Sequence, residues 1–288
     1  DKVAEDMQFK DADTLMLEVA KSARTIDYVS DTVWHAIEHT QKRFSFKKAI
    51  KLSTGILSEN NEIRFEDKFS IEGNPEIAFR VASIAAQQGL PIAPDAVLQI
   101  SANFLPIKSP WSRQAREDLI SLIGAGRPMI RVIEALDQEN LISKWIPEWE
   151  HVRFLPQRNV LHRHTVDRHM LETAVEAAKL TRTVRRPDLL LFASLFHDIG
   201  KGFPNKDHSE FGAELMGNLG ERIGFSRSDV EVLVFLVKEH LTLATAATRR
   251  DLDDPQTVAD VVAKVKTHEN LHLLHALSIA DGKATGKT

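Results

Sequence analysis

Side chains able to bind a metal gather in the second half of this sequence. Ten of the twelve histidines follow residue 150, although that part is less than half of the 288 residues. Cysteine is absent, which excludes disulfides and thiolate metal sites. Imidazole and carboxylate ligands without thiolate suit Mn, Mg, Fe or Zn. The composition therefore predicts a divalent metal centre built from histidine and acidic residues.

The pair His197-Asp198 is the strongest candidate, because it directly follows the apolar run 189–196. A helix this apolar should be buried, and a carboxylate at its end is costly to desolvate unless it is paired or bound to a cation. The negative end of the helix dipole also favours a cation there. Lys201 follows at once. It could contact whatever the metal binds, or it could be a solvated lysine, and the sequence favours neither.

Further ligands are expected from other helices. His169 lies in the first turns of the preceding helix, His208 begins the following one, and His240 and Asp281 lie on the apolar sides of two later helices. An inward aspartate is harder to explain as a core residue than an inward histidine. One metal would need His169, His197, Asp198 and Asp281. Adding His208 and His240 allows a second metal, with Asp198 as the bridge.

The elements that must position these residues are helices. The spacing of apolar residues and the positions of helix-breaking Gly and Pro predict helices at 165–182, 189–196, 209–220, 230–243, 255–267 and 269–281. Ser228 with Glu231 matches a capping box that would open the fourth of these helices. Residues 145–156 form an apolar connector without a clear period, and we expect Trp145 and Trp149 to pack at an interface there. The chain thus divides into residues 1–150 and 151–288.

The first part is also mostly helical by pattern. A long helix should start at Asp13 or Thr14, with one buried stripe formed by Leu15, Val19, Ile26, Val29, Val33 and Ile37. Further helices are expected at 75–89, 94–104, 111–124 and 126–138. Residues 62–71 alternate with period two and predict a short strand or hairpin. His35 and His39 lie one helical turn apart, but without a third ligand an ordinary helix surface is the better interpretation. The predicted fold class is all-α with a short β hairpin.

Charge and hydropathy exclude several classes of function. The formal net charge is −4, so nothing suggests a nucleic-acid partner. No apolar run approaches the ~20 residues of a membrane helix, and no signal peptide is evident. These features, with the absence of cysteine, are typical of a cytoplasmic protein. Because the chain opens at Asp1 without Met, we expect it to be part of a longer protein.

The ordered set His169, His197-Asp198 and Asp281 resembles the HD phosphohydrolase superfamily. The match becomes closer in longer segments, which are similar to the bacterial PII uridylyltransferase/uridylyl-removing enzymes. These segments are 161–169, 196–202, 207–213, 236–241, 249–251 and 280–285. Residues 22–26 and 30–34 are similar to the linker of this family in its actinobacterial branch. The resemblance implies a helical linker at 1–150, followed by an HD domain at 151–288.

The resemblance also implies an activity. This would be metal-dependent removal of a nucleotidyl group, UMP or AMP, from a tyrosine of the PII nitrogen-regulatory protein. One or two ions would act, with Mn or Mg the first choice and Fe or Zn as alternatives. Asp198 and Lys201 would be the catalytic residues. Arg249 and Arg250 would contact phosphate or partner, unless they are only a solvated basic loop that faces Asp251, Asp253 and Asp254.

Two departures from the family limit what we expect of the chain. His164 stands where the family usually has Tyr. The Gly-Ser turn and spaced aspartates of the nucleotidyltransferase domain are not found, and neither are the ACT domains, so only the removing activity is expected. Two alternatives stay open. One is an HD phosphohydrolase of free or cyclic nucleotides, which would turn over small substrates without PII. The other is a non-catalytic regulatory HD module, which would bind metal without turnover.

Overall fold

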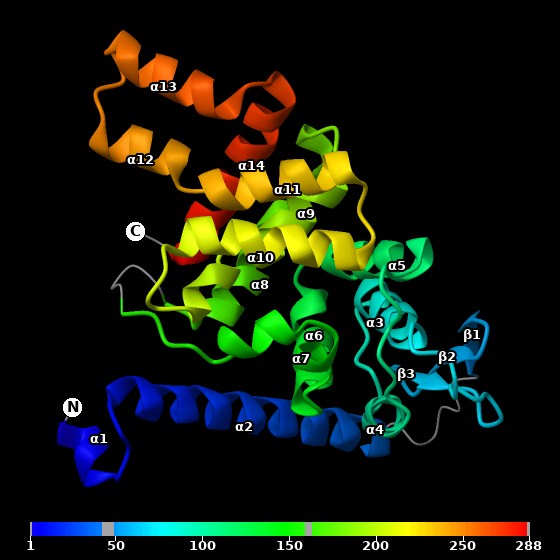
Figure 1. Ribbon diagram of the computed structural model, residues 1–288. Coiled ribbons are helices and arrows are strands. Elements are labelled where there is room, and N and C mark those ends of the chain that lie inside the picture. Colours follow the sequence, from blue (N-terminus) through cyan, green and yellow to red (C-terminus); the bar gives the residue numbers. More distant parts are fainter. Residues whose placement is uncertain (1, 42–48, 159–162, 287–288) are drawn as a thin grey trace.

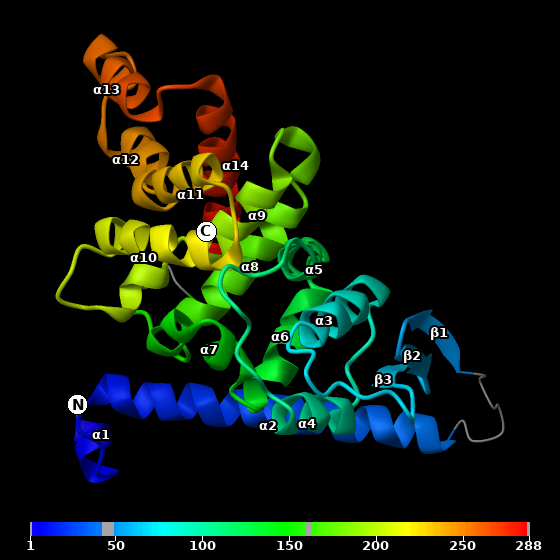
Figure 2. The ribbon, with the colours of Figure 1, turned by 45° about the vertical axis from the view of Figure 1, so that its right-hand side comes forward.

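The computed structural model describes residues 2–41, 49–158 and 163–286, and most of them are helical. The predicted all-α class with a small β element is confirmed (Figures 1 and 2). Among the described residues, no helix combines the length and hydropathy needed to cross a membrane.

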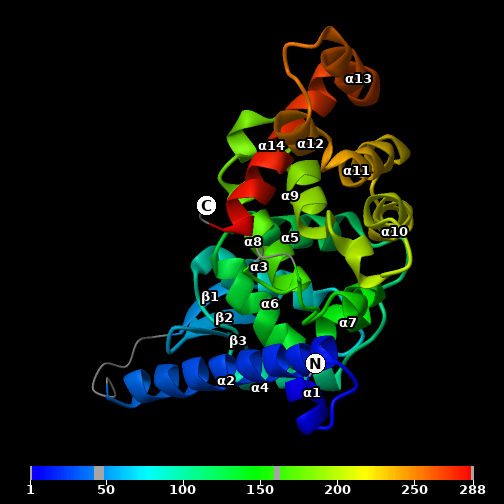
Figure 3. The ribbon, with the colours of Figure 1, turned by 90° about the vertical axis from the view of Figure 1, so that its left-hand side faces the viewer.

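The first part of the chain places one long helix along an edge of the molecule, with a small sheet near its C-terminal end (Figures 1 and 3). Its elements are α1 (Lys2–Asp6), α2 (Ala12–Gln41), β1 (Ile50–Ser53), β2 (Ile56–Glu59), β3 (Glu62–Phe65), α3 (Ile77–Gln88), α4 (Pro94–Ala102), α5 (Arg113–Gly124), α6 (Pro128–Gln138), α7 (Leu141–Trp145) and the 3-10 helix η1 (Pro147–His151). Four of the predicted helices therefore form within a few residues of their expected bounds.

The sheet has three antiparallel strands in the order β1-β2-β3. The predicted strand at 62–71 is correct only as far as Phe65, and the two strands before it were not predicted. Asn60 and Asn61 join β2 to β3 with φ of 53° and 60°, the left-handed conformation that a two-residue hairpin turn requires. This Asn-Asn pair was the sequence feature that could have revealed the second strand.

The second part is a bundle in which α14 lies against α8 and α9 (Figure 3). Its elements are α8 (Val166–Ala178), η2 (Thr181–Thr183), α9 (Pro187–Phe196), η3 (Ile199–Gly202), α10 (His208–Ile223), α11 (Arg227–Glu239), α12 (Thr242–Arg249), α13 (Pro255–Val265) and α14 (His268–Thr285). Every residue from Leu189 to Phe196 in α9 is buried, as the apolar run predicted.

The predicted N-cap of α11 was wrong by two residues. Ser226, not Ser228, is the N-cap, and its Oγ accepts a hydrogen bond of 3.2 Å from the backbone N–H of Asp229. Ser226 has the extended backbone that a cap needs, whereas Ser228 is already helical. Both serines precede an acidic residue by three positions, so the motif alone could not separate them. The single helix expected at 230–243 is in fact α11 and the start of α12.

The two parts of the chain share one continuous core. Trp145 packs on Phe79 at 4.9 Å between ring centroids, and Trp149 packs edge-on against Phe196 at 6.2 Å. The contact of Trp149 crosses between the two parts, as expected, whereas the ring of Trp145 packs on Phe79 within the first part. Because α5 packs against α9 of the second part, the division at residue 150 is not a break in the core, and it stays a prediction.

The apolar stripe predicted to be buried on α2 is instead exposed. Val19, Ile26 and Val33 keep 48%, 68% and 50% of their surface accessible; Val29 and Ile37 are exposed as well. The opposite face turns inward and carries Arg24 and Tyr28. Periodicity identifies an apolar stripe on a helix, but it does not show whether another element covers that stripe. Here the buried ion pair of Arg24 with Asp167 decides which face of α2 turns inward.

Arg24 anchors α2 to the start of α8. Its Nη1 lies 2.6 Å from Asp167 Oδ2, and its guanidinium stacks on the Phe154 ring at 4.5 Å. Asp167 is fully buried and also accepts the backbone N–H of Phe154 at 3.0 Å. Burial disfavours the charge on Arg24, but Asp167 outweighs this effect and raises the pKa of the guanidinium above its usual value. Arg24 is therefore charged and lies beside an enclosed carboxylate.

We expect Arg24→Ala to destabilise the protein by about 3–5 kcal/mol, because it leaves a buried carboxylate without its partner. Urea unfolding followed by circular dichroism measures this free energy. Arg113→Ala is the control, since Arg113 pairs with Glu117 on an exposed helix surface and should leave the midpoint almost unchanged. Equal midpoints for the two variants would contradict the role given to Arg24.

Candidate metal centre

Five helices direct imidazole and carboxylate groups to one point of the bundle. His169 lies in the first turn of α8, His197 and Asp198 join α9 to η3, and Asp281 lies in α14. His208 is the first residue of α10, and His240 directly follows α11. The structure thus brings together all six predicted ligands, in two groups of three: His169, His197 and Asp281, and Asp198, His208 and His240.

The first group is the more deeply enclosed. Asp281 Oδ1 lies 2.9 Å from His169 Nε2 and 3.6 Å from His197 Nε2. Both histidines are at most 1% exposed, whereas Asp281 is partly accessible. Ligand atoms of this type and spacing could hold one divalent cation.

Asp198 connects the two groups through its two oxygens. Oδ2 faces His197 Nε2 at 3.4 Å and His169 Nε2 at 3.7 Å. Oδ1 faces His240 Nε2 at 3.5 Å and His208 Nε2 at 4.0 Å. The carboxylate has the bridging position that a two-metal arrangement requires. Its role as a ligand stays a prediction, as do the roles of the other five residues.

Backbone carbonyls orient two of the imidazoles. Nδ1 of His197 lies 3.0 Å from the Ser194 carbonyl oxygen, and Nδ1 of His240 lies 2.7 Å from that of Val237. Donation from Nδ1–H to a carbonyl leaves Nε2 as the free ligand atom and fixes the ring plane. Both carbonyls belong to the last turn of the preceding helix, so helix geometry itself points these side chains into the centre.

The charges of the centre favour a cation. Burial opposes a charge on His197, but the carboxylates of Asp198 and Asp281 outweigh it and raise the pKa of the imidazole to about 10. Burial would also raise the pKa of Asp198, but His197, His240 and Lys201 hold it well below its usual range. Both carboxyl groups are thus ionised at neutral pH, and positive charge beside them is stabilised.

Hydrogen bonds within the protein do not satisfy all the polar atoms of the centre. Among the described residues, the buried atoms His197 Nε2 and Asp198 Oδ1 have no hydrogen-bond partner. A buried polar atom without a partner costs about 1–3 kcal/mol. Both atoms are ligand atoms by type, and both face the convergence point. The donor set therefore fits one or two divalent metals, without deciding which metal.

Lys201 lies beside the carboxylate of Asp198, at the edge of the candidate centre. Its Nζ is 2.6 Å from Asp198 Oδ2 and donates a 3.0 Å hydrogen bond to Gln157 Oε1. Gln157 in turn donates to the carbonyl of His164 at 3.1 Å. The side chain of Lys201 is only partly exposed, so it is not a freely solvated lysine. Gln157 was not predicted, because a lone glutamine in a connector has no distinctive spacing.

Gly200 allows α10 to approach the Asp198 turn. A Cβ at this position would lie 2.0 Å from the His208 carbonyl oxygen and 2.8 Å from the Gly212 amide nitrogen. The other end of the turn is fixed by Asp207, which caps α10 by accepting the N–H groups of Ser209 and Glu210. Backbone contact and helix cap together set the place of His208.

The two predicted substrate contacts differ in their surroundings. Arg250 donates a 2.9 Å hydrogen bond to Asp260 and lines a hollow between α10, α11 and the α12–α13 hairpin. Arg249 ends α12 as an exposed residue. The aspartate that Arg250 meets lies on α13, not in the loop at 251–254 that the alternative interpretation assumed.

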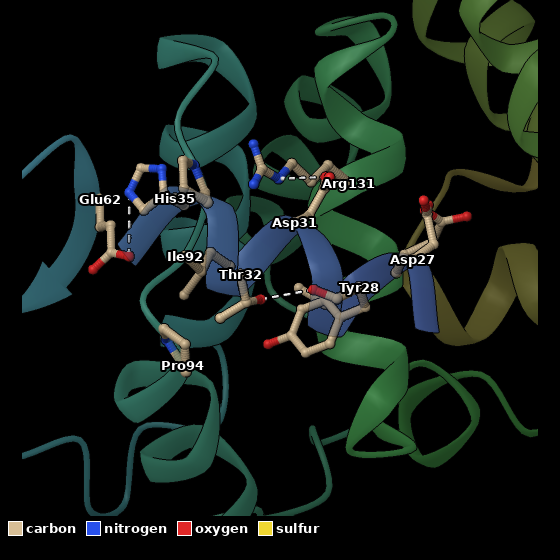
Figure 4. A pocket seen from close by; sticks show the side chains of 12 residues that line it. Asp27, Tyr28, Asp31, Thr32, His35, Glu62, Ile92, Pro94 and Arg131 are labelled. Carbon is tan, nitrogen blue, oxygen red and sulfur yellow. Dashed lines mark hydrogen bonds and ion pairs between the residues drawn. The ribbon is translucent and has the colours of Figure 1, made fainter. Parts of the chain in front are cut away.

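A second hollow lies between α2, α6 and β3, and it contains His35 (Figure 4). His35 Nε2 is 3.3 Å from Glu62 Oε1, and Arg131 Nε is 3.7 Å from Asp31 Oδ2 (Figure 4). His35 belongs to none of the metal-binding groups found among the described residues. The side chain of His39 lies outside the described residues.

Comparison with known proteins agrees with this arrangement. Residues 166–285 match the HD domain family. Three bacterial proteins, each named bifunctional uridylyltransferase/uridylyl-removing enzyme, align with 99% of this chain. They come from Streptomyces coelicolor, Mycobacterium tuberculosis and Corynebacterium glutamicum, with 43%, 38% and 33% identity. The chain covers 36%, 36% and 42% of their respective lengths, so it spans well under half of these relatives.

We expect the parent protein to bind two divalent ions per chain, and His208→Ala to bind one. Removing a ligand of the second group leaves the first group complete. Elemental analysis of the purified protein after equilibration with Mn gives the count. His275→Ala, which removes an exposed histidine of α14, should leave the count unchanged. One ion in both the parent and His208→Ala would contradict the second site.

Gly200→Ala should displace α10 from the Asp198 turn. We expect a loss of about 1–3 kcal/mol in stability from overpacking, together with loss of the ion held by Asp198, His208 and His240. Thermal unfolding and elemental analysis measure the two effects. Gly217→Ala, within α10 itself, is the control, since its Cβ would meet only Val234 Cγ2 at 3.6 Å. A full metal count in Gly200→Ala would show that the close approach does not position His208.

Proposed function

The chain corresponds to a segment of the bifunctional uridylyltransferase/uridylyl-removing enzymes, and from this relationship and its site we propose that it is a metal-dependent phosphodiesterase acting on nucleotidylated PII protein. It would hydrolyse the bond between the phosphorus of a nucleotidyl group and a tyrosyl oxygen of PII. The convergence of four imidazoles on the bridging carboxylate of Asp198 is the observation that carries the proposal.

A divalent metal held by these residues would supply an activated water and positive charge beside the phosphate. Asp198 is ionised at neutral pH because its imidazole neighbours and Lys201 lower its pKa. It can therefore accept a hydrogen bond from the attacking water and keep that water aligned with phosphorus. The same carboxylate fixes the imidazoles on either side, so one residue serves both binding and alignment.

Lys201 would offset the negative charge that develops on the phosphoryl oxygens. Its ammonium group is held by Asp198 on one side and by Gln157 on the other, so it is preorganised instead of being drawn from solvent. Groups fixed in this way stabilise a transition state without reorganising. The tyrosyl leaving group, with a pKa near ~10, needs little protonation to depart.

The name of the relatives, uridylyl-removing enzyme, favours UMP as the removed group, and AMP is the alternative. The complete donor set supports a hydrolase over a regulatory module, because a module that only sensed a ligand would not require every catalytic position. Turnover of a small diester such as bis(p-nitrophenyl) phosphate at the rate of modified PII would favour the alternative of a hydrolase for free or cyclic nucleotides.

Asp198→Asn and Lys201→Ala test the mechanism with nucleotidylated PII as substrate and Mn present. We expect nucleotide release to fall by about 10²–10³-fold in either variant, the range for losing one electrostatic contact in a transition state. Asp198→Asn should also lose metal, whereas Lys201→Ala should keep it. Lys179→Ala is the control, because Lys179 is an exposed lysine paired with Glu176. Undiminished release by both site variants would refute the proposed function.

A further inference from the structure

A hollow of about 850 Å³, partly open to solvent, adjoins the second half of the metal centre. It lies between the start of α10, the end of α11 and the hairpin formed by α12 and α13, which projects beyond the bundle in Figure 1. Nothing in the mechanism above uses it.

The hollow and the metal centre share the same helix ends. Asp207 and Ser209, on either side of His208, line the hollow. Glu239 and Leu241, on either side of His240, also line it. Neighbouring residues at the start of α10 and at the end of α11 thus form the wall of the hollow and the second group of candidate ligands.

Each cation in the wall of the hollow is paired with a carboxylate, and the fourth carboxylate, Asp207, caps α10. Three cations each meet a carboxylate at 2.8–2.9 Å: Lys238 with Glu210, Lys264 with Glu239 and Arg250 with Asp260. No surplus positive charge remains among these pairs to hold further phosphates. The wall suits a substituent that is polar and uncharged, which describes a ribose with its base better than a polyphosphate.

One buried hydroxyl in the wall lacks a partner. Thr257 is only 3% exposed, and its Oγ1 makes no hydrogen bond within the part of the chain that the structure describes. A buried hydroxyl of this kind can donate and accept at once. Thr242 and Thr245 add two more hydroxyls to the lining, and Leu241 and Val261 add apolar surface. Hydroxyls beside apolar side chains are what a nucleoside needs for hydrogen bonding and for packing its base.

We propose that this hollow binds the nucleoside part of the nucleotidyl ester while the phosphate lies at the metal centre. The inference rests on the proposed function and specifies where the substrate lies. Arg250, in this arrangement, shapes the wall through Asp260 and does not bind phosphate. The hollow is thus the place where the identity of the base would be distinguished.

Calorimetric titration of the Mn-loaded protein with UMP, AMP and inorganic phosphate tests the assignment. We expect the preferred nucleotide to bind at least tenfold more tightly than phosphate. Thr257→Val keeps the side-chain shape and should weaken nucleotide binding by about three- to tenfold. Ala246→Trp fills the hollow and should weaken it by more than tenfold. Affinity for phosphate and the metal count should stay at the parent values in both variants.

Two control variants share the same helix, α12. Thr248→Val removes an exposed hydroxyl bonded to the carbonyl of Ala244, and Ala247→Trp adds the same bulk outside the hollow. Both should bind nucleotide as the parent does. The assignment is overturned if nucleotide and phosphate bind equally, or if Ala246→Trp behaves like Ala247→Trp. A parent protein that bound neither metal nor phosphate would instead refute the metal centre.

Discussion

The burial of Asp198 is the constraint on which the second half of the molecule depends. This carboxylate is 2% exposed, and an unpaired charge at that depth would cost several kcal/mol. Imidazoles from α8, α10, α11 and the end of α9 face it, and each of these helices must therefore begin or end beside it. Such an arrangement fixes helix lengths more strictly than apolar packing does, since one extra turn of helix would move a ligand by about 5.4 Å.

The same constraint explains why residues that converge in the structure could be selected from the sequence, whereas the orientation of α2 could not. His240 and Asp281 stood out because polar residues on apolar helix faces need a reason, and the structure places both at one point with Asp198. Gln157 could not be found in this way, since its position depends on how a connector folds back. The α2 stripe was misjudged for a related reason. Apolar spacing looks the same whether the covering partner lies within the chain or not, and a single buried pair, Arg24 with Asp167, outweighs it.

Arg24 and Asp167 also show how the two parts of the chain are mechanically joined. Asp167 precedes the metal-site histidine His169 by two residues in the first turn of α8. Its carboxylate accepts hydrogen bonds from the backbone of Phe154 and from Thr165 as well as from Arg24. Contacts with both the long helix α2 and the connector therefore fix the position of the start of α8. A linker that only tethered the bundle would not need a buried ion pair so close to the centre.

The two sides of the centre have different surroundings, and in the proposed arrangement this difference decides on which side each substituent of the phosphodiester lies. A phosphodiester has two substituents, and displacement requires the attacking and leaving oxygens to lie roughly in line. With the nucleoside in the hollow beside His208 and His240, the tyrosyl oxygen would lie away from α12 and α13, towards Lys201 and Gln157. That side is formed by the connector and η3, because Gln157 accepts the hydrogen bond of Lys201. A protein loop carrying a tyrosine would reach phosphorus from this side without entering the hollow. The asymmetry of the centre thus suits an ester that joins a small molecule to a protein.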